Sequence, residues 1–322
     1  MKSKILLISG DASFRSFYRV ILNKKSKIIV RAKKEKYKNL IAYTAVNQYL
    51  RKNKILAPKL LGHNYKKGTI IIEDFGDVSY HKVLKKSKKK IKIYQKLVNN
   101  LVKIQKVKTT NKIKGVINKV HIIQKYSQKI LREESDLFFN WYLPLFLKKK
   151  ETLYIKKKLR KILSNLYKKL NFSNSYFVHR DYHSQNLMKV GNKIGVIDTQ
   201  DALRGNPAYD LVSLIDDVRI KTPKKLKDTI YRYYLKKSIL ISANNKILFE
   251  EDFNILSVQR SLKIIGIFAR LFKRDKKNKY LKFIPYTWKI LEARMKPKIF
   301  LGLRKVLNNS VKIKIRKKVD YK

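Results

Sequence analysis

The stretch FVHRDYHSQNLMKVGNKIGVIDTQDA, residues 177–202, carries the side chains of this sequence that are best suited to catalysis. Asp181 follows an apolar run, Asn186 lies five residues further on, and Asp198 ends the apolar run KIGVID. A carboxylate can orient an attacking hydroxyl and accept its proton, and Mg²⁺ prefers carboxylate and amide oxygens as ligands. Phosphoryl transfer needs both kinds of group. The spacing therefore predicts Asp181 as the catalytic base, with Asn186 and Asp198 as metal ligands.

A structural alternative exists for each of these residues taken singly. Either aspartate could begin a turn, because Asp is common at turn positions. That preference does not account for the whole pattern HRDxxxxN followed by an aspartate at the end of a strand, which is typical of kinase catalytic loops. We expect His179 to hold the loop rather than to transfer protons. For His183, contact with the γ-phosphate of a nucleotide and an ordinary place on the loop surface stay equally open.

The residues after Asp198 argue against a peptide acceptor. A protein kinase has a long activation segment at this point, which forms a platform for peptides. Here the sequence continues as TQDALRGNPAYDLVSL, and we expect the next helix to begin near Tyr209. A chain spans at most about 3.5 Å per residue, so this short connection cannot build such a platform. The acceptor is therefore expected to be a small molecule in a pocket over the loop.

The elements that position these residues differ between the two parts of the chain. Up to Gly76 the sequence predicts a small sheet with one helix over residues 37–52, because short alternating or β-branched runs are separated by Gly and Pro. Beyond Gly76 we expect long helices over residues 80–107 and 119–170, and again from Tyr209 to about Lys305. The strands YFVH and KIGVID bracket the loop, and the basic tail after Pro297 is expected to be frayed or a solvated helix. The predicted fold is thus α+β, with a small β-rich N-lobe (1–76) and a larger, mostly helical C-lobe (77–322).

Composition limits the possible classes of protein. The chain has 322 residues and no cysteine, which excludes disulfides and thiolate chemistry. No run approaches the roughly 18 apolar residues of a membrane helix, and the first residues do not form a signal peptide, so we expect a cytoplasmic monomer without a membrane span. The formal net charge is +57, but the lysines are spread from end to end. This spread favours a solvated surface over a nucleic-acid interface, in which basic residues concentrate on one element.

Several blocks of the sequence resemble a known family. HRDYHSQNLM, GVIDTQDALRGNPAYDLVSLIDDVR and QRSLKIIGIFARLFKRDKKNKYLKFIP are similar to the aminoglycoside-phosphotransferase-like kinases. They resemble more closely the bacterial branch that contains the anomeric N-acetylmuramate/N-acetylglucosamine kinases of cell-wall recycling. GDASFRSFYRV and IIEDFGD also match that branch, so the resemblance extends from Gly10 to Pro285. It implies a bilobal protein-kinase-like fold, ATP and Mg²⁺ as cofactors, and an amino sugar as the acceptor.

The resemblance also implies roles for further residues. The turn GDASFRSF would cover the nucleotide phosphates, the segment after TIII would be the hinge that binds adenine through its backbone, and the residues after Asp198 would line the mouth of the sugar pocket. Asp210 would brace the catalytic loop. The usual strand lysine is missing, and Arg31 or Lys33 could replace it. The residues so implied are Gly10, Ser13, Phe14, Glu73, Asp74 and Phe75 for the nucleotide, and Gln200, Asp201 and Arg204 for the substrate. We add Arg31 to the nucleotide site in place of the lysine, and His183 to the substrate site from its position in the loop.

Three other readings stay open at this point. The acceptor could be another small hydroxyl compound, such as an aminoglycoside, choline or a different sugar. An aminoglycoside is a polycation, and Asp201, Asp216, Asp217 and Asp275 could supply an acidic pocket for it. The chain could instead be a basic RNA-binding protein, or an inactive protein with a kinase fold, since the helix after Arg31 carries no glutamate to pair with a strand lysine.

Overall fold

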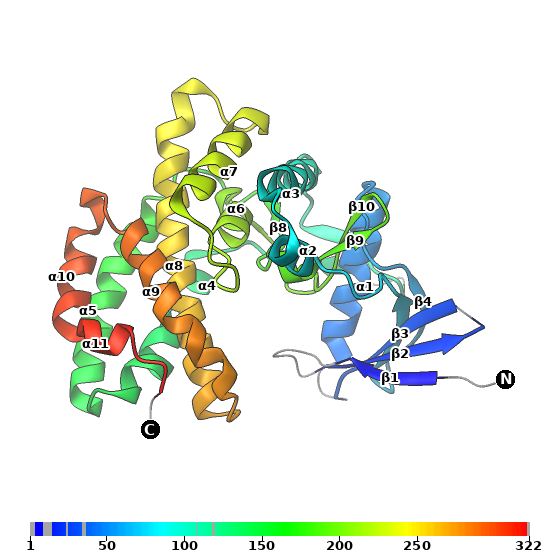
Figure 1. Cartoon of the computed structure of the whole chain (residues 1–322), viewed down its shortest axis with the longest axis horizontal. Helices are drawn as coiled ribbons and strands as arrows, with labels where there is room; N and C mark the ends of the chain where they lie inside the picture. Colours follow the sequence, from blue (N-terminus) through cyan, green and yellow to red (C-terminus); the bar gives the residue numbers. More distant parts are fainter. Residues whose placement is uncertain are drawn as a thin grey trace. The chain divides into compact units, whose positions relative to one another are not determined.

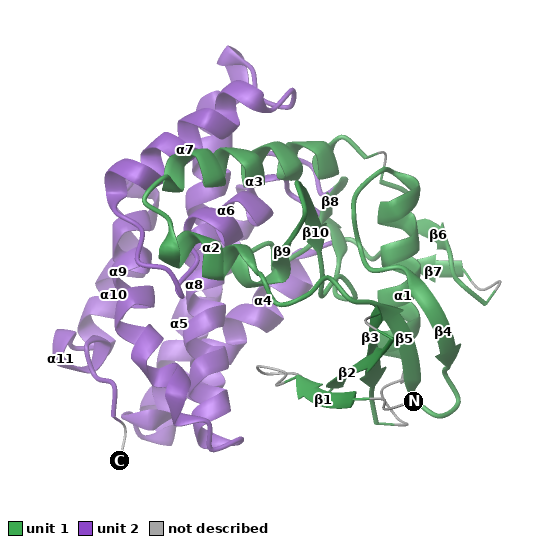
Figure 2. Ribbon diagram, turned by 45° about the vertical axis from the view of Figure 1, so that its right-hand side comes forward, with its two compact units in different colours: residues 1–125, 175–204 green, residues 126–174, 205–322 purple. Residues whose placement is uncertain are grey.

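The computed structural model describes residues 4–8, 15–23, 25–33, 37–107, 109–117 and 120–320. The chain divides into two compact units, which Figure 2 shows in different colours. Unit 1 comprises residues 1–125 and 175–204, and unit 2 comprises residues 126–174 and 205–322. The predicted catalytic loop and the N-terminal sheet therefore lie in the same unit. The lobe boundary at residue 76 remains a prediction.

A five-stranded antiparallel sheet with one helix forms the first part of unit 1. Its strand order is β1-β2-β3-β5-β4. The helix α1 (Tyr37–Lys52) has the predicted bounds, whereas the short strand β4 was not predicted. Leu40 of α1 and Val30 and Ile70 of the sheet are at most 1% exposed and belong to one apolar cluster, so α1 packs on the sheet. The strands are β1 (Lys4–Ile8), β2 (Ser16–Leu22), β3 (Lys25–Arg31), β4 (Leu60–Asn64) and β5 (Thr69–Glu73).

The second part of unit 1 holds the catalytic loop between short helices and hairpins. The helix expected over residues 80–107 is two helices, because Ser87 has an extended backbone (φ −88°, ψ 136°) and ends the first of them. Ser79 begins that helix by accepting a hydrogen bond from the N–H of Lys82. The elements are α2 (Tyr80–Lys86), α3 (Lys90–Gln105), β6 (Lys112–Lys114), β7 (Val120–Ile122), β8 (Tyr176–Val178), a 3₁₀ turn (Ser184–Asn186), β9 (Leu187–Val190), β10 (Lys193–Val196) and β11 (Leu203–Gly205).

Unit 2 is helical and is organised around α8 (Lys246–Lys273), the long helix that Figure 1 shows beside α4, α6 and α9. The helix expected over residues 119–170 is interrupted. The start of this range forms the strand β7 instead of a helix. Further along, Pro144, which has no N–H to donate, lies in a 3₁₀ turn between two helices. The helical segments are α4 (Gln128–Leu137), a π-helix (Phe138–Tyr142), 3₁₀ turns (Leu143–Leu145, Ala243–Asn245, Asn278–Phe283 and Lys298–Phe300), α5 (Lys149–Lys168), α6 (Ala208–Ile215), α7 (Lys224–Lys237), α9 (Ile284–Arg294), α10 (Leu301–Ser310) and α11 (Ile313–Arg316).

The basic tail after Pro297 is packed, so the expectation of a frayed or solvated tail was wrong. Leu303, Leu307 and Val311 are fully buried, and α10 packs on α5. Leu303 and Leu307 are four residues apart and so lie on one face of α10, and Val311 follows directly after its last residue. In the described part of the chain, no helix is both long enough and apolar enough to cross a membrane.

Candidate active site

The β9–β10 hairpin brings two of the predicted functional residues to one end. Its strands pair antiparallel through the turn at Gly191, whose φ of +55° favours glycine. Leu187 pairs with Val196 at the open end, and the N–H of Ile197 donates to the carbonyl of Asn186 at 3.0 Å. Asn186 and Asp198 therefore flank this end of the hairpin.

His179 and Asn186 hold the predicted catalytic loop through hydrogen bonds, His179 by both ring nitrogens and Asn186 by its Nδ2. His179 is 1% exposed, and its Nδ1 accepts from the N–H of Asp181 at 3.3 Å. Its Nε2 is then the protonated nitrogen, which donates to the carbonyl of Ile197 at 2.9 Å. Asn186 Nδ2 donates to the carbonyl of Asp181 at 3.0 Å, which identifies Oδ1 as the oxygen available for a cation. Arg180 between them has φ +72°, a strained value that is common at functional sites.

Tyr182 fixes the loop to α3. It is fully buried, its hydroxyl donates to the carbonyl of Leu97, and it accepts from Asn100 Nδ2, both at 2.9 Å. Its neighbour His183 is only 6% exposed, so the alternative of an ordinary place on the loop surface does not hold. Contact of His183 with a substrate stays a prediction.

Helix α1 fixes the segment around Asp198. The buried hydroxyl of Thr199 donates to Asn47 Oδ1 of α1 at 2.6 Å. Asp198 itself has φ +64°, which is unfavourable for a residue with a Cβ and persists only where the surroundings impose it. Its side chain is 35% exposed, so the carboxylate is open to small ions from solution.

Arg15 is the functional candidate that sequence reasoning missed. Its Nη2 donates to Asp198 Oδ1 at 2.5 Å, and its Nη1 donates to Gln200 Oε1 at 2.7 Å. The guanidinium is buried and lies within 6 Å of the ring centres of Phe17 (5.6 Å) and Tyr43 (5.8 Å). Burial raises the pKa of Tyr43 to about 12, so this ring stays neutral. The only signal in the sequence is an arginine between aromatic residues after the turn GDASF.

The predicted hinge is held through its side chains. Burial by itself would raise the pKa of Asp74, but the hydrogen bonds from Arg19, at 2.5 and 3.0 Å, and from the N–H of Gly76 lower it. Glu73 accepts from Arg51 at 3.2 Å. The ring of Phe75 lies over Gly195, where an added Cβ would come within 2.6 Å of it. The backbone N–H of Glu73 also donates to the protein itself, to the carbonyl of Lys59 at 2.9 Å. Binding of adenine by the backbone of this segment stays a prediction.

The other predicted residues have less distinctive surroundings. Arg31 is exposed at the end of β3, with its guanidinium 5.6 Å from the ring centre of Tyr18, and Lys33 is also exposed. Asp201 Oδ2 accepts from Gln200 at 2.7 Å, and Arg204 Nε donates to the carbonyl of Ile123 at 3.2 Å. Asp210 is fully buried in α6 of unit 2. Gly10, Ser13 and Phe14 lie outside the described residues.

The donor set around the loop suits Mg²⁺. Within the described ranges, no group of three or more His, Asp or Glu side chains could hold a metal ion. Mg²⁺ does not need one, because it is usually bound by one or two carboxylates together with substrate phosphates and water. Asp198 with the amide oxygen of Asn186 meets that requirement.

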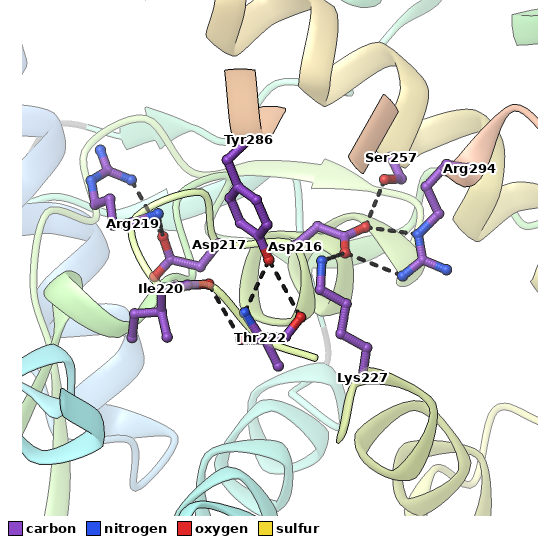
Figure 3. Close-up of polar contacts among 9 residues, drawn as sticks. All are labelled: Asp216, Asp217, Arg219, Ile220, Thr222, Lys227, Ser257, Tyr286 and Arg294. Carbon is purple, nitrogen blue, oxygen red and sulfur yellow. Dashed lines mark hydrogen bonds and ion pairs between the residues drawn. The ribbon is translucent and has the colours of Figure 1, made fainter. Parts of the chain in front are cut away.

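A second polar cluster lies in unit 2 and accounts for two of the acidic residues after the loop (Figure 3). Asp216 is 3% exposed, and its carboxylate accepts from Lys227 at 2.7 Å, Arg294 at 2.9 Å and Ser257 at 2.7 Å. Asp217 accepts from the N–H of Arg219 at 3.0 Å. The Asp216 carboxylate thus ties the loop after α6 to α7, α8 and α9, and basic neighbours compensate its charge.

Comparison with known proteins places the chain in a family. The model of the phosphotransferase enzyme family matches residues 4–242. The chain belongs to this family. Membership makes it a small-molecule phosphotransferase with an alcohol group as acceptor, as predicted from the loop and the short segment after Asp198.

Curated relatives of this phosphotransferase match it over most of its length. It is 28% identical to an N-acetylmuramate/N-acetylglucosamine kinase of Pseudomonas aeruginosa, over 90% of this chain and 83% of the relative. It is 26% identical to an N-acetylmuramate/N-acetylglucosamine kinase of Neisseria meningitidis, over 86% of this chain and 81% of the relative. The predicted resemblance to this branch is confirmed.

Solved structures confirm the fold class of the phosphotransferase. An ethanolamine kinase of Plasmodium vivax superposes with a TM-score of 0.61 at 12% identity, covering 93% of this chain and 84% of that one. An ADP-bound aminoglycoside phosphotransferase superposes with a TM-score of 0.57 at 13% identity, covering 90% and 92%. The α+β, protein-kinase-like fold was therefore predicted correctly.

Proposed function

We propose that the chain is a cytoplasmic, ATP- and Mg²⁺-dependent sugar kinase that phosphorylates the anomeric hydroxyl of N-acetylmuramate or N-acetylglucosamine. The observation that carries this proposal is the similarity to kinases of that name along most of both chains. The described contacts are compatible with the reaction type, because Asn186 and Asp198 flank one end of a hairpin and the amide of Asn186 holds the backbone of Asp181.

Each residue of the site has a distinct role in the proposed transfer. Asp181 orients the sugar hydroxyl and accepts its proton as the oxygen bonds to the γ-phosphorus. The bond from phosphorus to the ADP oxygen breaks, and ADP leaves. Asn186 and Asp198 would hold Mg²⁺, which supplies positive charge beside the phosphates. His179 keeps the backbone of Asp181 in place through its two ring nitrogens.

The charges of unit 2 favour a neutral or anionic acceptor over a polycation. Three of the four acidic residues that could have lined an acidic pocket have basic neighbours. Asp216 pairs with Lys227 and Arg294, and the Nε of Arg274 donates to Asp275 at 2.7 Å. Asp217 lies 3.8 Å from the guanidinium of Arg219. Carboxylates neutralised in this way offer little attraction to an aminoglycoside, whereas the net charge of +57 suits the carboxylate of N-acetylmuramate.

The test is an ATP-consumption screen of the purified chain against amino sugars, with the position of the product phosphate read by NMR. We expect turnover with N-acetylmuramate or N-acetylglucosamine and a phosphate on the anomeric oxygen. Asp181→Ala and Asp198→Ala should abolish turnover, while circular dichroism shows an intact fold.

Asp228→Asn is the matched control for these variants, because it removes an aspartate whose side chain is 38% exposed and pairs with the exposed Lys224 in the same helix. It should keep wild-type turnover. Undiminished turnover in either catalytic variant would contradict the assigned roles, and activity only with choline or an aminoglycoside would contradict the acceptor.

A further inference from the structure

Arg15 contacts the proposed metal ligand Asp198 but has no part in the transfer as described so far. It precedes β2 by one residue, is 7% exposed, and contacts both Asp198 and Gln200. Arginine remains protonated at any working pH. The fold therefore buries a permanent positive charge directly against the predicted metal ligand, next to where a nucleotide's phosphates would lie.

The two residues that the sequence analysis offered as phosphate-binding cations are both exposed. Arg31 is exposed and stacks over Tyr18, and Lys33 is exposed beyond the end of β3. A strand lysine in a kinase is held by a glutamate of the neighbouring helix. Helix α1 has the sequence YKNLIAYTAVNQYLRK, which contains no acidic residue.

Arg15 has the support that Arg31 lacks. The carboxylate of Asp198 and the amide of Gln200 hold two of its nitrogens at 2.5 and 2.7 Å. The rings of Phe17 and Tyr43 lie against its guanidinium, and aromatic faces attract such a cation. Asp198 thus holds the cation of Arg15 as the helix glutamate holds the lysine of other kinases. Because Asp198 is also the proposed metal ligand, the guanidinium lies beside the proposed metal site.

We propose that Arg15 is the phosphate-binding cation of this chain, filling the role of the missing strand lysine. Its planar guanidinium can donate two parallel hydrogen bonds to phosphate oxygens, which an ammonium group cannot do with the same geometry. The inference rests on the proposed function, since it requires that the site binds ATP. A merely structural alternative is that Arg15 only orients Asp198 for the metal.

The experiment measures binding of three ligands by calorimetry or ligand-observed NMR: adenosine, ADP with EDTA, and ADP with Mg²⁺. Arg15→Gln should bind adenosine like the wild type, because the ring and ribose do not involve the guanidinium. It should bind ADP about ten- to a hundred-fold more weakly, with and without Mg²⁺, because charge-assisted hydrogen bonds to the phosphates are lost. Arg15→Lys keeps the charge but not the paired geometry, so its affinity for ADP should lie between those of the wild type and Arg15→Gln. If Arg15→Gln does not fold, Arg15→Lys is the variant to be measured.

Arg160→Gln is the matched control. It also removes an arginine that pairs with an aspartate, Asp136, but it lies on α5 in unit 2. It should bind all three ligands like the wild type.

Four outcomes would overturn the proposal. If Arg15→Gln weakens only binding of ADP with Mg²⁺, Arg15 acts through Asp198 alone. If Arg31→Gln weakens ADP binding and Arg15→Gln does not, Arg31 is the phosphate-binding cation. If the wild type binds Mg·ADP and Arg15→Gln binds it equally well, this inference fails while the proposed function stands. A wild type that binds no nucleotide would overturn both.

Discussion

Replacement of Asp216 by asparagine should destabilise unit 2 by about 3–5 kcal/mol, the cost of leaving buried charges without their partner. The substitution preserves the shape of the side chain and removes only its charge. Lys227 and Arg294, whose side chains are 12% and 21% exposed, would then face a neutral amide at 2.7 and 2.9 Å. Solvent screens charges little at that degree of burial, so most of the lost attraction should appear in the free energy of unfolding.

The loss should also depend on pH. Burial opposes ionisation of Asp216, but Arg294 and Lys227 outweigh it and hold its pKa well below the ordinary value of 3.8. A carboxyl group with a lower pKa in the folded state stabilises the protein above the pKa of its unfolded state, and that stability is lost as the pH falls. The difference in unfolding free energy between wild type and Asp216→Asn should therefore be constant near neutral pH and shrink below about pH 4.

Tryptophan fluorescence during urea unfolding is a suitable assay, because both tryptophans of the chain, Trp141 and Trp288, belong to unit 2. Asp228→Asn serves as the matched control in the neighbouring helix. Its ion pair with Lys224 is exposed, so its loss should cost less than about 0.5 kcal/mol. The reasoning is refuted if Asp216→Asn costs no more than Asp228→Asn, or if the difference grows as the pH falls.

Two further predictions concern single contacts. Gly266→Ala should destabilise unit 2 by about 3 kcal/mol in the same assay, because an added Cβ would clash with the backbone of Leu137, which cannot rotate away. Tyr182→Phe should cost about 1–2 kcal/mol and lower kcat for the sugar kinase reaction, because the carbonyl of Leu97 and the amide of Asn100 each lose a buried partner that fixes the catalytic loop.

Each of these variants has a control of the same chemical kind. Gly302→Ala lies in α10, where the nearest atom to an added Cβ is 3.9 Å away, so it should be neutral or stabilising. Tyr154→Phe alters a tyrosine that is 61% exposed and should leave stability and kcat unchanged. Equal changes in unfolding free energy for Gly266→Ala and Gly302→Ala would contradict the packing argument. A wild-type kcat in Tyr182→Phe would contradict the argument that Tyr182 fixes the loop.

The spacing of apolar residues and the positions of Gly and Pro predicted those elements that form from short-range interactions. Helix α1 has its predicted bounds because apolar residues recur at helical spacing and Pro58 lies beyond its end. The strand expected at KIGVID is β10, which pairs with β9 through the turn at Gly191. The same reasoning failed over residues 119–170, where the aromatic run FFNWYLPLF forms a π-helix and a 3₁₀ turn. There Phe138 and Tyr142 pack against Trp288, which is distant in the sequence.

The candidate site divides in the same way. Asp181, Asn186 and Asp198 could be proposed from the sequence because one loop and the hairpin that directly follows it carry them. Arg15 could not, since 183 positions separate it from Asp198. Only packing of the N-terminal sheet and α1 against the hairpin segment brings that guanidinium to the carboxylate, and no local pattern encodes a contact made through so long an intervening chain.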